Sequence, residues 1–408
     1  MTEGFQIVSN RCDRSACDIR FLNQQVADKA TAFHSSFPQY RPTPLRRLQA
    51  LAGQMGVGEI FVKDESYRFG LNAFKVLGGS FAIGQYIAQR LGRDLSELPY
   101  SVMTSPEVKR ELGELTFVTA TDGNHGRGVA WTANQLGQKS VVYMPKGSAP
   151  ERLENIRKEN SDASITDLRY DDTVRLAKQR AEQPNCVLVQ DTSWDGYTEV
   201  PSWILQGYTT MANEVREELE SQQLLAPTHI FLQAGVGSMP AALAGYFTNI
   251  YAQHKPIITV VEPNKADCIF RTARAAESKM ARWRWAQAAG LSGVHWAMAA
   301  GSRRNMPSPE QGASTSTASN QGPKCAAMRA GVSLQTTAFG TPMRSTFSNR
   351  MRARAGWISL ATRIPCPPSR SAICVLFPPG AAHRSSTVSP GFASTQRAAS
   401  WLACPSTW

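Results

Sequence analysis

The chain has 408 residues and a formal net charge of +12, and its length is enough for two ordinary domains and a sizeable core. The first residues, MTEGFQIVSN, lack the pattern of a secretion signal, and no stretch is apolar for long enough to span a membrane. Eight scattered cysteines without paired spacing favour free thiols in a reducing compartment. We therefore expect a cytoplasmic protein with no membrane partner and no metal site.

The positive charge is confined to the last third of the chain. Residues 275–408 hold 13 arginines and 2 lysines against Glu277 and Glu310, whereas residues 1–274 hold 29 basic and 30 acidic residues. A basic chain invites a nucleic-acid interpretation. Because the excess lies in one segment, we expect no nucleic-acid partner and treat the two parts as different kinds of sequence.

Strand and helix patterns alternate between residues 40 and 274. Strands are expected at 59–65, 115–120, 140–145, 163–170, 186–192, 228–235 and 256–263, and helices at 75–92, 126–137, 150–160, 171–183, 203–222 and 239–252. Alternation of this kind predicts a parallel sheet with helices on both faces. Ligands in such folds bind where strands end and loops begin, so three strand-to-helix turns are candidate sites.

The first turn contains Lys75, in the stretch FGLNAFKVLGGS. A surface lysine at the start of a helix is the plain interpretation. However, cations are disfavoured near a helix N-terminus, and a desolvated lysine becomes a nucleophile that forms a Schiff base with a carbonyl. Lys75 is therefore a candidate catalytic residue.

The second turn is TDGNHGRG, residues 121–128. Its glycines allow close approach of a ligand to the backbone, Asn124 can donate and accept hydrogen bonds, and Asp122 and His125 can titrate. The plain interpretation is a tight turn in which Asp122 caps the following helix.

The third turn is QAGVGSM, residues 233–239, directly after an expected strand. Gly235 and Gly237, with Ser238 opening a helix, would present backbone N–H groups and a helix N-terminus to an anion. The third glycine of a dinucleotide fingerprint is missing. Beside a Schiff-base lysine, an anion site suggests a phosphorylated aldehyde, namely pyridoxal phosphate.

Several motifs together resemble the diaminopropionate ammonia-lyases, which are pyridoxal-phosphate enzymes of fold type II, the tryptophan-synthase-β type. The resemblance runs from about residue 38 to 271. It rests on YRPTPL (40–45), RFGLNAFK (68–75), TDGNHGRGVAW (121–131), YMPKGSAPER (143–152), RYDDTVRLA (169–177), VQDTSWDGY (189–197) and LQAGVGSM (232–239).

The resemblance implies roles for individual residues. Lys75 would form the Schiff base with pyridoxal phosphate and act as base for the L-substrate, and Asp122 would be the base for the D-isomer. Asn124 would contact the phenolic oxygen of the cofactor, and Asp191 would lie near the amino groups of the substrate. The residues expected along the phosphate are Gly235, Val236, Gly237 and Ser238. The family reaction is α,β-elimination of 2,3-diaminopropionate to pyruvate and two ammonia.

The resemblance also implies the architecture. An α/β large domain is expected at 1–88 and 196–274, with a smaller α/β domain at 89–195, and homodimers are common in the family. Three other residues have plain interpretations. Cys268 is expected to be a small buried residue, His125 to be structural, and Tyr208 to face the core.

The tail at 275–408 does not continue the family pattern, which leaves the large domain incomplete. It has no aspartate, and residues 363–391 show no helix or strand period. A basic disordered extension, a divergent domain and translation in a shifted reading frame are the competing explanations. The composition of the tail favours translation in a shifted reading frame, and one alternative to an active ammonia-lyase is therefore an inactive product. The other alternative is a serine or threonine dehydratase of the same fold type.

Overall fold

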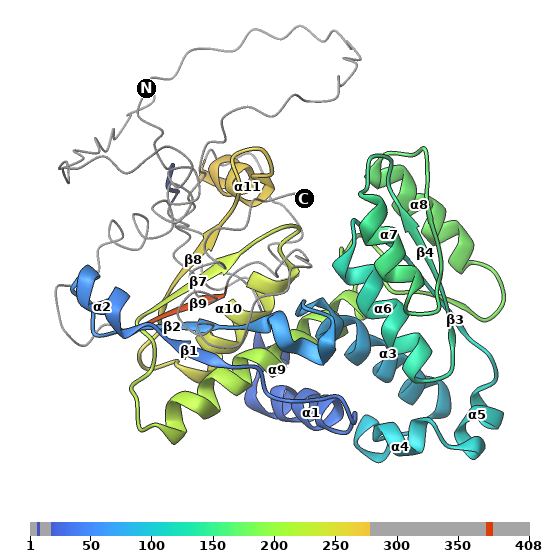
Figure 1. Ribbon diagram of the computed structural model, residues 1–408, viewed down its shortest axis with the longest axis horizontal. Coiled ribbons are helices and arrows are strands. Elements are labelled where there is room, and N and C mark those ends of the chain that lie inside the picture. Colours follow the sequence, from blue (N-terminus) through green and yellow to red (C-terminus); the bar gives the residue numbers. More distant parts are fainter. Residues whose placement is uncertain (1–5, 9–17, 278–372, 378–408) are drawn as a thin grey trace, which may run out of the picture.

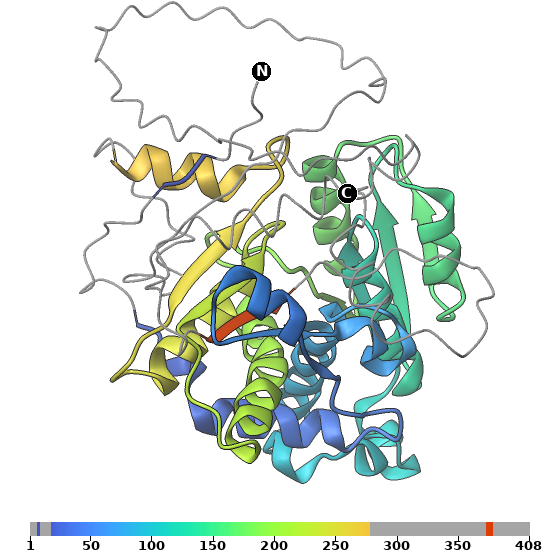
Figure 2. The same ribbon diagram turned by 60° about the vertical axis from the view of Figure 1, so that its left-hand side comes forward.

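The computed structural model describes residues 6–8, 18–277 and 373–377 (Figure 1). The expectations for the rest of the tail therefore lie outside the described residues. Within the described part, two sheets lie on opposite sides of the helices α3 (Lys75–Leu91) and α9 (Glu199–Ser221). Figures 1 and 2 show this arrangement from two directions.

The first sheet has the strand order β1-β2-β9-β7-β8. Its strands are β1 (Leu45–Arg47), β2 (Glu59–Lys63), β7 (His229–Gln233), β8 (Ile257–Val261) and β9 (Ile373–Phe377). Only β1 is antiparallel to its neighbour, and the pairings of β2 with β9, β9 with β7, and β7 with β8 are all parallel. The predicted parallel sheet is confirmed, with one antiparallel edge strand.

Strand β9 lies in the tail, in a segment whose sequence shows no strand period. Residues 373–377 read ICVLF and pair with β2 on one side and β7 on the other (Figure 2). A strand buried in the middle of a parallel sheet is apolar throughout and shows no alternation. The absence of a strand period at 363–391 therefore did not exclude a strand at residues 373–377.

The second sheet has the order β5-β4-β3-β6, and all its pairings are parallel. Its strands are β3 (Thr116–Ala120), β4 (Lys139–Met144), β5 (Asp162–Ile165) and β6 (Cys186–Leu188). Three helices accompany it, namely α6 (Asn124–Gln135), α7 (Pro150–Arg157) and α8 (Tyr170–Ala181). All of these elements fall within 89–195, although the expected boundary at 88 lies in the last turn of α3.

One further α-helix, α10 (Ser238–Ile250), was expected from the sequence. The other α-helices of the described residues were not expected, namely α1 (Gln24–Ser35), α2 (Gln49–Met55), α4 (Tyr100–Met103), α5 (Pro106–Leu112) and α11 (Cys268–Glu277). No helix in the described ranges is long and apolar enough to cross a membrane. The same residues contain no group of three or more histidine, cysteine, aspartate or glutamate side chains arranged to hold a metal ion.

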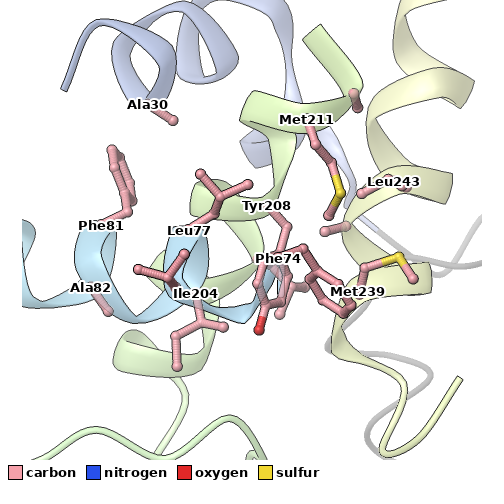
Figure 3. Close-up of a cluster of buried hydrophobic side chains, with 14 of the residues drawn as sticks. Ala30, Phe74, Leu77, Phe81, Ala82, Ile204, Tyr208, Met211, Met239 and Leu243 are labelled. Atoms are coloured by element: carbon pink, nitrogen blue, oxygen red, sulfur yellow. The ribbon is translucent and has the colours of Figure 1, made fainter. Parts of the chain in front are cut away.

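Helix α3 is packed tightly against α9 because glycines lie at their contact. A Cβ on Gly207 would lie 2.3 Å from the carbonyl oxygen of Leu77, and a Cβ on Gly78 would lie 2.7 Å from Tyr208. Figure 3 shows the apolar side chains around this contact, including Leu77, Phe81 and Tyr208. The two backbones approach so closely that α9 fixes the position of α3, whose first residue is Lys75.

A buried group of charges holds the loop that precedes α3. Arg68 is fully buried and forms ion pairs with Glu65 at 2.8 Å and with Glu214 of α9 at 2.7 Å. Glu214 also pairs with Lys63 at 2.5 Å. Burial alone would raise the pKa of Glu214, but the charges of Arg68 and Lys63 lower it. These ion pairs connect the end of β2 and the loop that follows it to Glu214 of α9.

Candidate active site

Lys75 and Asp191 meet although they lie far apart in the chain. Lys75 is the first residue of α3 and its side chain is 20% exposed, while Asp191 follows β6 and its side chain is 4% exposed. The Nζ atom of Lys75 donates a hydrogen bond to Oδ2 of Asp191 at 2.5 Å. The structure therefore brings together two of the three predicted catalytic residues, at the end of β6 and the start of α3.

Asp191 is ionised despite its burial. Burial acts to raise the pKa of this carboxyl group, but the charge of the neighbouring Lys75 and its hydrogen bond lower it to about 2. An opposite charge in direct contact outweighs desolvation in such a pair. At neutral pH the site therefore holds a fixed negative charge directly beside the lysine.

Asp122 lies in the second turn and has a counter-ion of its own. Nη1 of Arg152, on α7, is 2.5 Å from Oδ2 of Asp122, whose side chain is 40% exposed. Asp122 does not cap α6, because the residue before the helix is Gly123, with φ of 154° and no side-chain cap. The hydroxyl of Thr121 instead accepts hydrogen bonds from the N–H groups of Gly123 and Gly126. The capping interpretation was therefore wrong.

In the second turn Asn124 is exposed, whereas His125 is buried. Asn124 is the first residue of α6 and is exposed. His125 is buried, with Nε2 2.8 Å from the carbonyl oxygen of Val189. Burial lowers the pKa of His125, so the ring is neutral and donates to this carbonyl. Its contact with the backbone just before Asp191 fits the expected structural role.

The third turn forms an open helix N-terminus. Gly237 precedes α10 with φ of 99° in the left-handed region, where glycine is unstrained. No side chain caps the helix, and Val236 is 41% exposed. Ser238 is the first helical residue. Uncapped N–H groups at a helix of this length suit a phosphate group, so the turn fits the predicted phosphate loop.

Tyr208 of α9 lies beside the start of α3. Its ring packs against Phe74, the residue directly before Lys75, with centroids 5.4 Å apart. Its hydroxyl is buried and makes no hydrogen bond that meets the geometric criteria within the described ranges. Burial raises the pKa of this hydroxyl well above the ordinary value, and the charge of Asp191 adds to the effect. The residue faces the core, as expected.

Cys268 is exposed, so the prediction of a buried residue was wrong. Its thiol donates to the carbonyl oxygen of Gly235 at 3.3 Å, next to the phosphate loop. Partial burial and the Glu262 carboxylate raise the pKa of this thiol to about 11. The thiol is therefore protonated at neutral pH and a poor nucleophile.

Sequence reasoning missed four residues around the site. Arg152 pairs with Asp122. Gln190 contacts Asp191, and Tyr170 and Tyr197 form hydrogen bonds with Gln190. All four lie inside the segments 143–152, 169–177 and 189–197 that carry the family resemblance. Only their long-range partners distinguish them, and those partners cannot be read from the local sequence.

Comparison with known proteins agrees with this geometry. A family model described as "Pyridoxal-phosphate dependent enzyme" matches residues 37–303, which extends beyond residue 271, where the quoted motifs end. Diaminopropionate ammonia-lyase of Salmonella typhimurium is 51% identical over 255 residues, covering 62% of this chain and 63% of that protein. The corresponding protein of Escherichia coli K12 is 49% identical over 252 residues, covering 62% of each. The chain therefore spans less than two thirds of the length of these relatives.

Solved structures show the same fold. The cofactor-bound diaminopropionate ammonia-lyase of Escherichia coli has a TM-score of 0.66 and 39% identity, covering 74% of this chain and 78% of that one. Processed threonine deaminase isoform 2 of Solanum lycopersicum has a TM-score of 0.56 at 15% identity, covering 99% of this chain and 98% of that one, and so shares the fold alone. The predicted fold class, with a parallel-sheet large part and a smaller α/β part, is confirmed.

The residues present fit pyridoxal phosphate. The uncapped N-terminus of α10 suits a phosphate group, and the half-buried Lys75 beside Asp191 suits an aldehyde. The family match covers most of the chain and includes all three turns. From this site and this match we conclude that the chain belongs to the pyridoxal-phosphate dependent enzymes.

Proposed function

We propose that the protein eliminates ammonia from 2,3-diaminopropionate and that water hydrolyses the released product, giving pyruvate and two ammonia in total. The observation that carries the proposal is the buried Asp191 carboxylate, which stays ionised beside Lys75. A substrate whose leaving group is a β-ammonium gains a counter-charge there, whereas the neutral hydroxyl of serine does not need one. The two relatives of about 50% identity are named diaminopropionate ammonia-lyase.

Each site residue has a proposed task. Bound pyridoxal phosphate supplies the electron sink that acidifies the α-carbon of the substrate. Lys75 takes the α-proton of the L-isomer and Asp122, oriented by Arg152, takes that of the D-isomer. Asn124 contacts the phenolic oxygen of the cofactor, and Asp191 holds the β-ammonium. The phosphate is held by the loop Gly235, Val236, Gly237 and Ser238.

A dehydratase acting on serine or threonine is the second candidate. D-serine dehydratase of Salmonella newport is 22% identical over 252 residues, and the Escherichia coli lyase has been solved "in complex with D-serine". Both observations show that related sites accept a hydroxyl in the β-position. The preference between an amino and a hydroxyl leaving group therefore separates the two candidates.

The proposal is tested by pyruvate release from the purified chain supplied with pyridoxal phosphate. The substrates are both isomers of diaminopropionate and of serine, and the variants are Asp191→Ala and, as control, Asp172→Ala. Asp172 is an exposed aspartate that pairs with Arg175 on α8. We expect diaminopropionate to be preferred, with the preference lost only in Asp191→Ala. An unchanged preference in that variant contradicts the role of Asp191, and no pyruvate from a folded, cofactor-loaded chain contradicts the activity.

The domain boundaries, the homodimer and the cytoplasmic location are proposals on the same basis. Limited proteolysis should cut in the loops nearest these boundaries, at 92–94 directly after α3 and near 195, if the two sheets belong to separate domains. Sedimentation of the cofactor-loaded chain should give twice the mass of one chain. A protein that resists cleavage at both positions, or sediments as a single chain, contradicts the respective proposal.

A further inference from the structure

The side chain of Gln190 connects three parts of the site. It is fully buried, directly before Asp191. Its Oε1 accepts hydrogen bonds from the N–H of Ala120 at 3.0 Å and from the hydroxyl of Thr119 at 3.1 Å, both at the end of β3. Its Nε2 donates to the hydroxyl of Tyr170 at 3.2 Å and lies 3.5 Å from Oδ1 of Asp191. One amide therefore contacts β3, the start of α8 and the carboxylate.

The orientation of this amide follows from its partners. The N–H group of Ala120 can only donate, so the atom that faces it must be the oxygen of Gln190. The amide nitrogen consequently faces Tyr170 and Asp191. This donor lies on the side of the Asp191 carboxylate away from Lys75, because Oδ2 is bonded to the lysine and Oδ1 is nearer the amide.

The backbone of Gln190 is held as well. The hydroxyl of Tyr197 accepts a hydrogen bond from the N–H of Gln190 at 2.8 Å and donates to the carbonyl oxygen of Leu188 at 3.0 Å. The ring of Tyr197 is stacked on Trp194, with centroids 4.4 Å apart. Both the side chain and the main chain of Gln190 therefore have little freedom.

The strand held by Gln190 leads directly into the Asp122 turn. Ala120 is the last residue of β3, and Thr121 and Asp122 follow it. We propose that Gln190 is a positioning residue that holds Asp191 against Lys75 and sets its place relative to Asp122. The inference rests on the proposed function only in assigning Lys75 to the cofactor and Asp191 to the substrate.

Replacement of Gln190 by glutamate tests this role, because the direction of the pH dependence in the variant can be predicted. The carboxyl group introduced by Gln190→Glu would keep the acceptor oxygen and, when protonated, would donate as the amide does. When ionised it would place a second negative charge beside Asp191, which is unfavourable in a buried site. Lys75 from α3 is in direct contact with Asp191. The other titratable groups that interact electrostatically with Asp191 are His125 from α6, Tyr170 from α8, Tyr208 from α9 and Tyr197 from the loop after β6. Lys75 is already paired with Asp191.

The experiment compares Gln190→Glu, Gln190→Met and the surface control Gln183→Glu with the wild-type chain across pH. Gln183 is exposed. The two readouts are kcat/KM with diaminopropionate and the Kd of pyridoxal phosphate from its absorbance, with circular dichroism to verify folding. We expect the ratio of Gln190→Glu to wild type in kcat/KM to rise about tenfold from about pH 9 to about pH 6 as the carboxyl group protonates. Gln190→Met should lose about 10- to 100-fold in kcat/KM at every pH.

Two results would overturn the inference. One is a folded Gln190→Glu variant whose kcat/KM and cofactor Kd, each divided by the wild-type value, are both independent of pH. A purely space-filling role of Gln190 predicts this result. The other is wild-type kcat/KM and cofactor Kd in Gln190→Met. If the wild-type chain binds the cofactor but does not react with diaminopropionate, the proposed function fails, and the pH dependence of the cofactor Kd still decides the role of Gln190.

Discussion

Substitution of Gly207 by alanine tests whether the contact of α3 with α9 positions the site. The added Cβ would lie 2.3 Å from the carbonyl oxygen of Leu77, 2.8 Å from Cβ of Phe81 and 3.0 Å from Cα of Gly78. Ordinary contacts begin near 3.4 Å. None of the three atoms lies at the end of a flexible side chain, so the helices themselves must move apart by roughly 1 Å in a close-packed interior.

The expected energetic effect is a balance of two terms. Overpacking of this kind costs about 1–3 kcal/mol, and alanine recovers up to about 1 kcal/mol of helix propensity relative to glycine. We expect a net decrease of about 1 kcal/mol in the free energy of unfolding. Because α3 begins with Lys75, a displacement of about 1 Å relative to Asp191 should also lower kcat by about 100-fold.

Urea unfolding and pyruvate release from diaminopropionate measure the two effects. Gly53→Ala in α2 is the matched control, since a Cβ there meets nothing within 4 Å and the variant should be as stable as the wild type or slightly more so. If Gly207→Ala were as stable and as active as Gly53→Ala, the reasoning about the α3–α9 contact would be refuted.

Two further predictions concern buried charge. Arg68→Met leaves Glu65 buried without this counter-ion and Glu214 with Lys63 alone, and it should lower the free energy of unfolding by about 3–5 kcal/mol. Arg175→Met, which removes an exposed pair, should lower it by less than about 1 kcal/mol. Similar losses for the two variants in chemical denaturation would contradict this. Burial, with the charge of Arg68, lowers the pKa of His34 from 6.5 to about 3, so its stabilisation is complete above pH 6.5 and is lost as the pH falls toward 3. Between pH 6.5 and about pH 5 the free energy of unfolding should therefore fall by about 2 kcal/mol through protonation of His34. In His34→Gln the free energy of unfolding should depend less on pH in this range. The same slope of the free energy against pH in the variant and the wild type would rule out this role of His34.

The alternating elements could be predicted because their local patterns and their caps agree. Helix α3 was expected at 75–92 and is Lys75–Leu91, ending at Gly92 with φ of 62°. Gly137 likewise follows α6 in the left-handed region. Glycine after an amphipathic run is a physical stop for a helix, so these ends were visible in the sequence alone.

The features that could not be predicted depend on contacts between segments that are distant in the sequence. Strand β9 is recognisable only from its neighbours β2 and β7, because a uniformly apolar run of five residues in a proline-rich tail has no period of its own. Lys75 and Asp191 were both predicted, but as separate roles implied by the family resemblance. Their ion pair, and the bonds of Gln190 to β3, join residues that are far apart in sequence and became visible only in the fold.

The most direct test of the central claim is chemical identification of the lysine that carries the cofactor. The chain is incubated with pyridoxal phosphate, reduced with borohydride and mapped by peptide mass spectrometry. The account predicts a stable label on Lys75, no label on the buried and paired Lys63, and loss of the label and of the visible absorbance in Lys75→Ala. A label spread over surface lysines, with Lys75 unmodified in the folded protein, would contradict it.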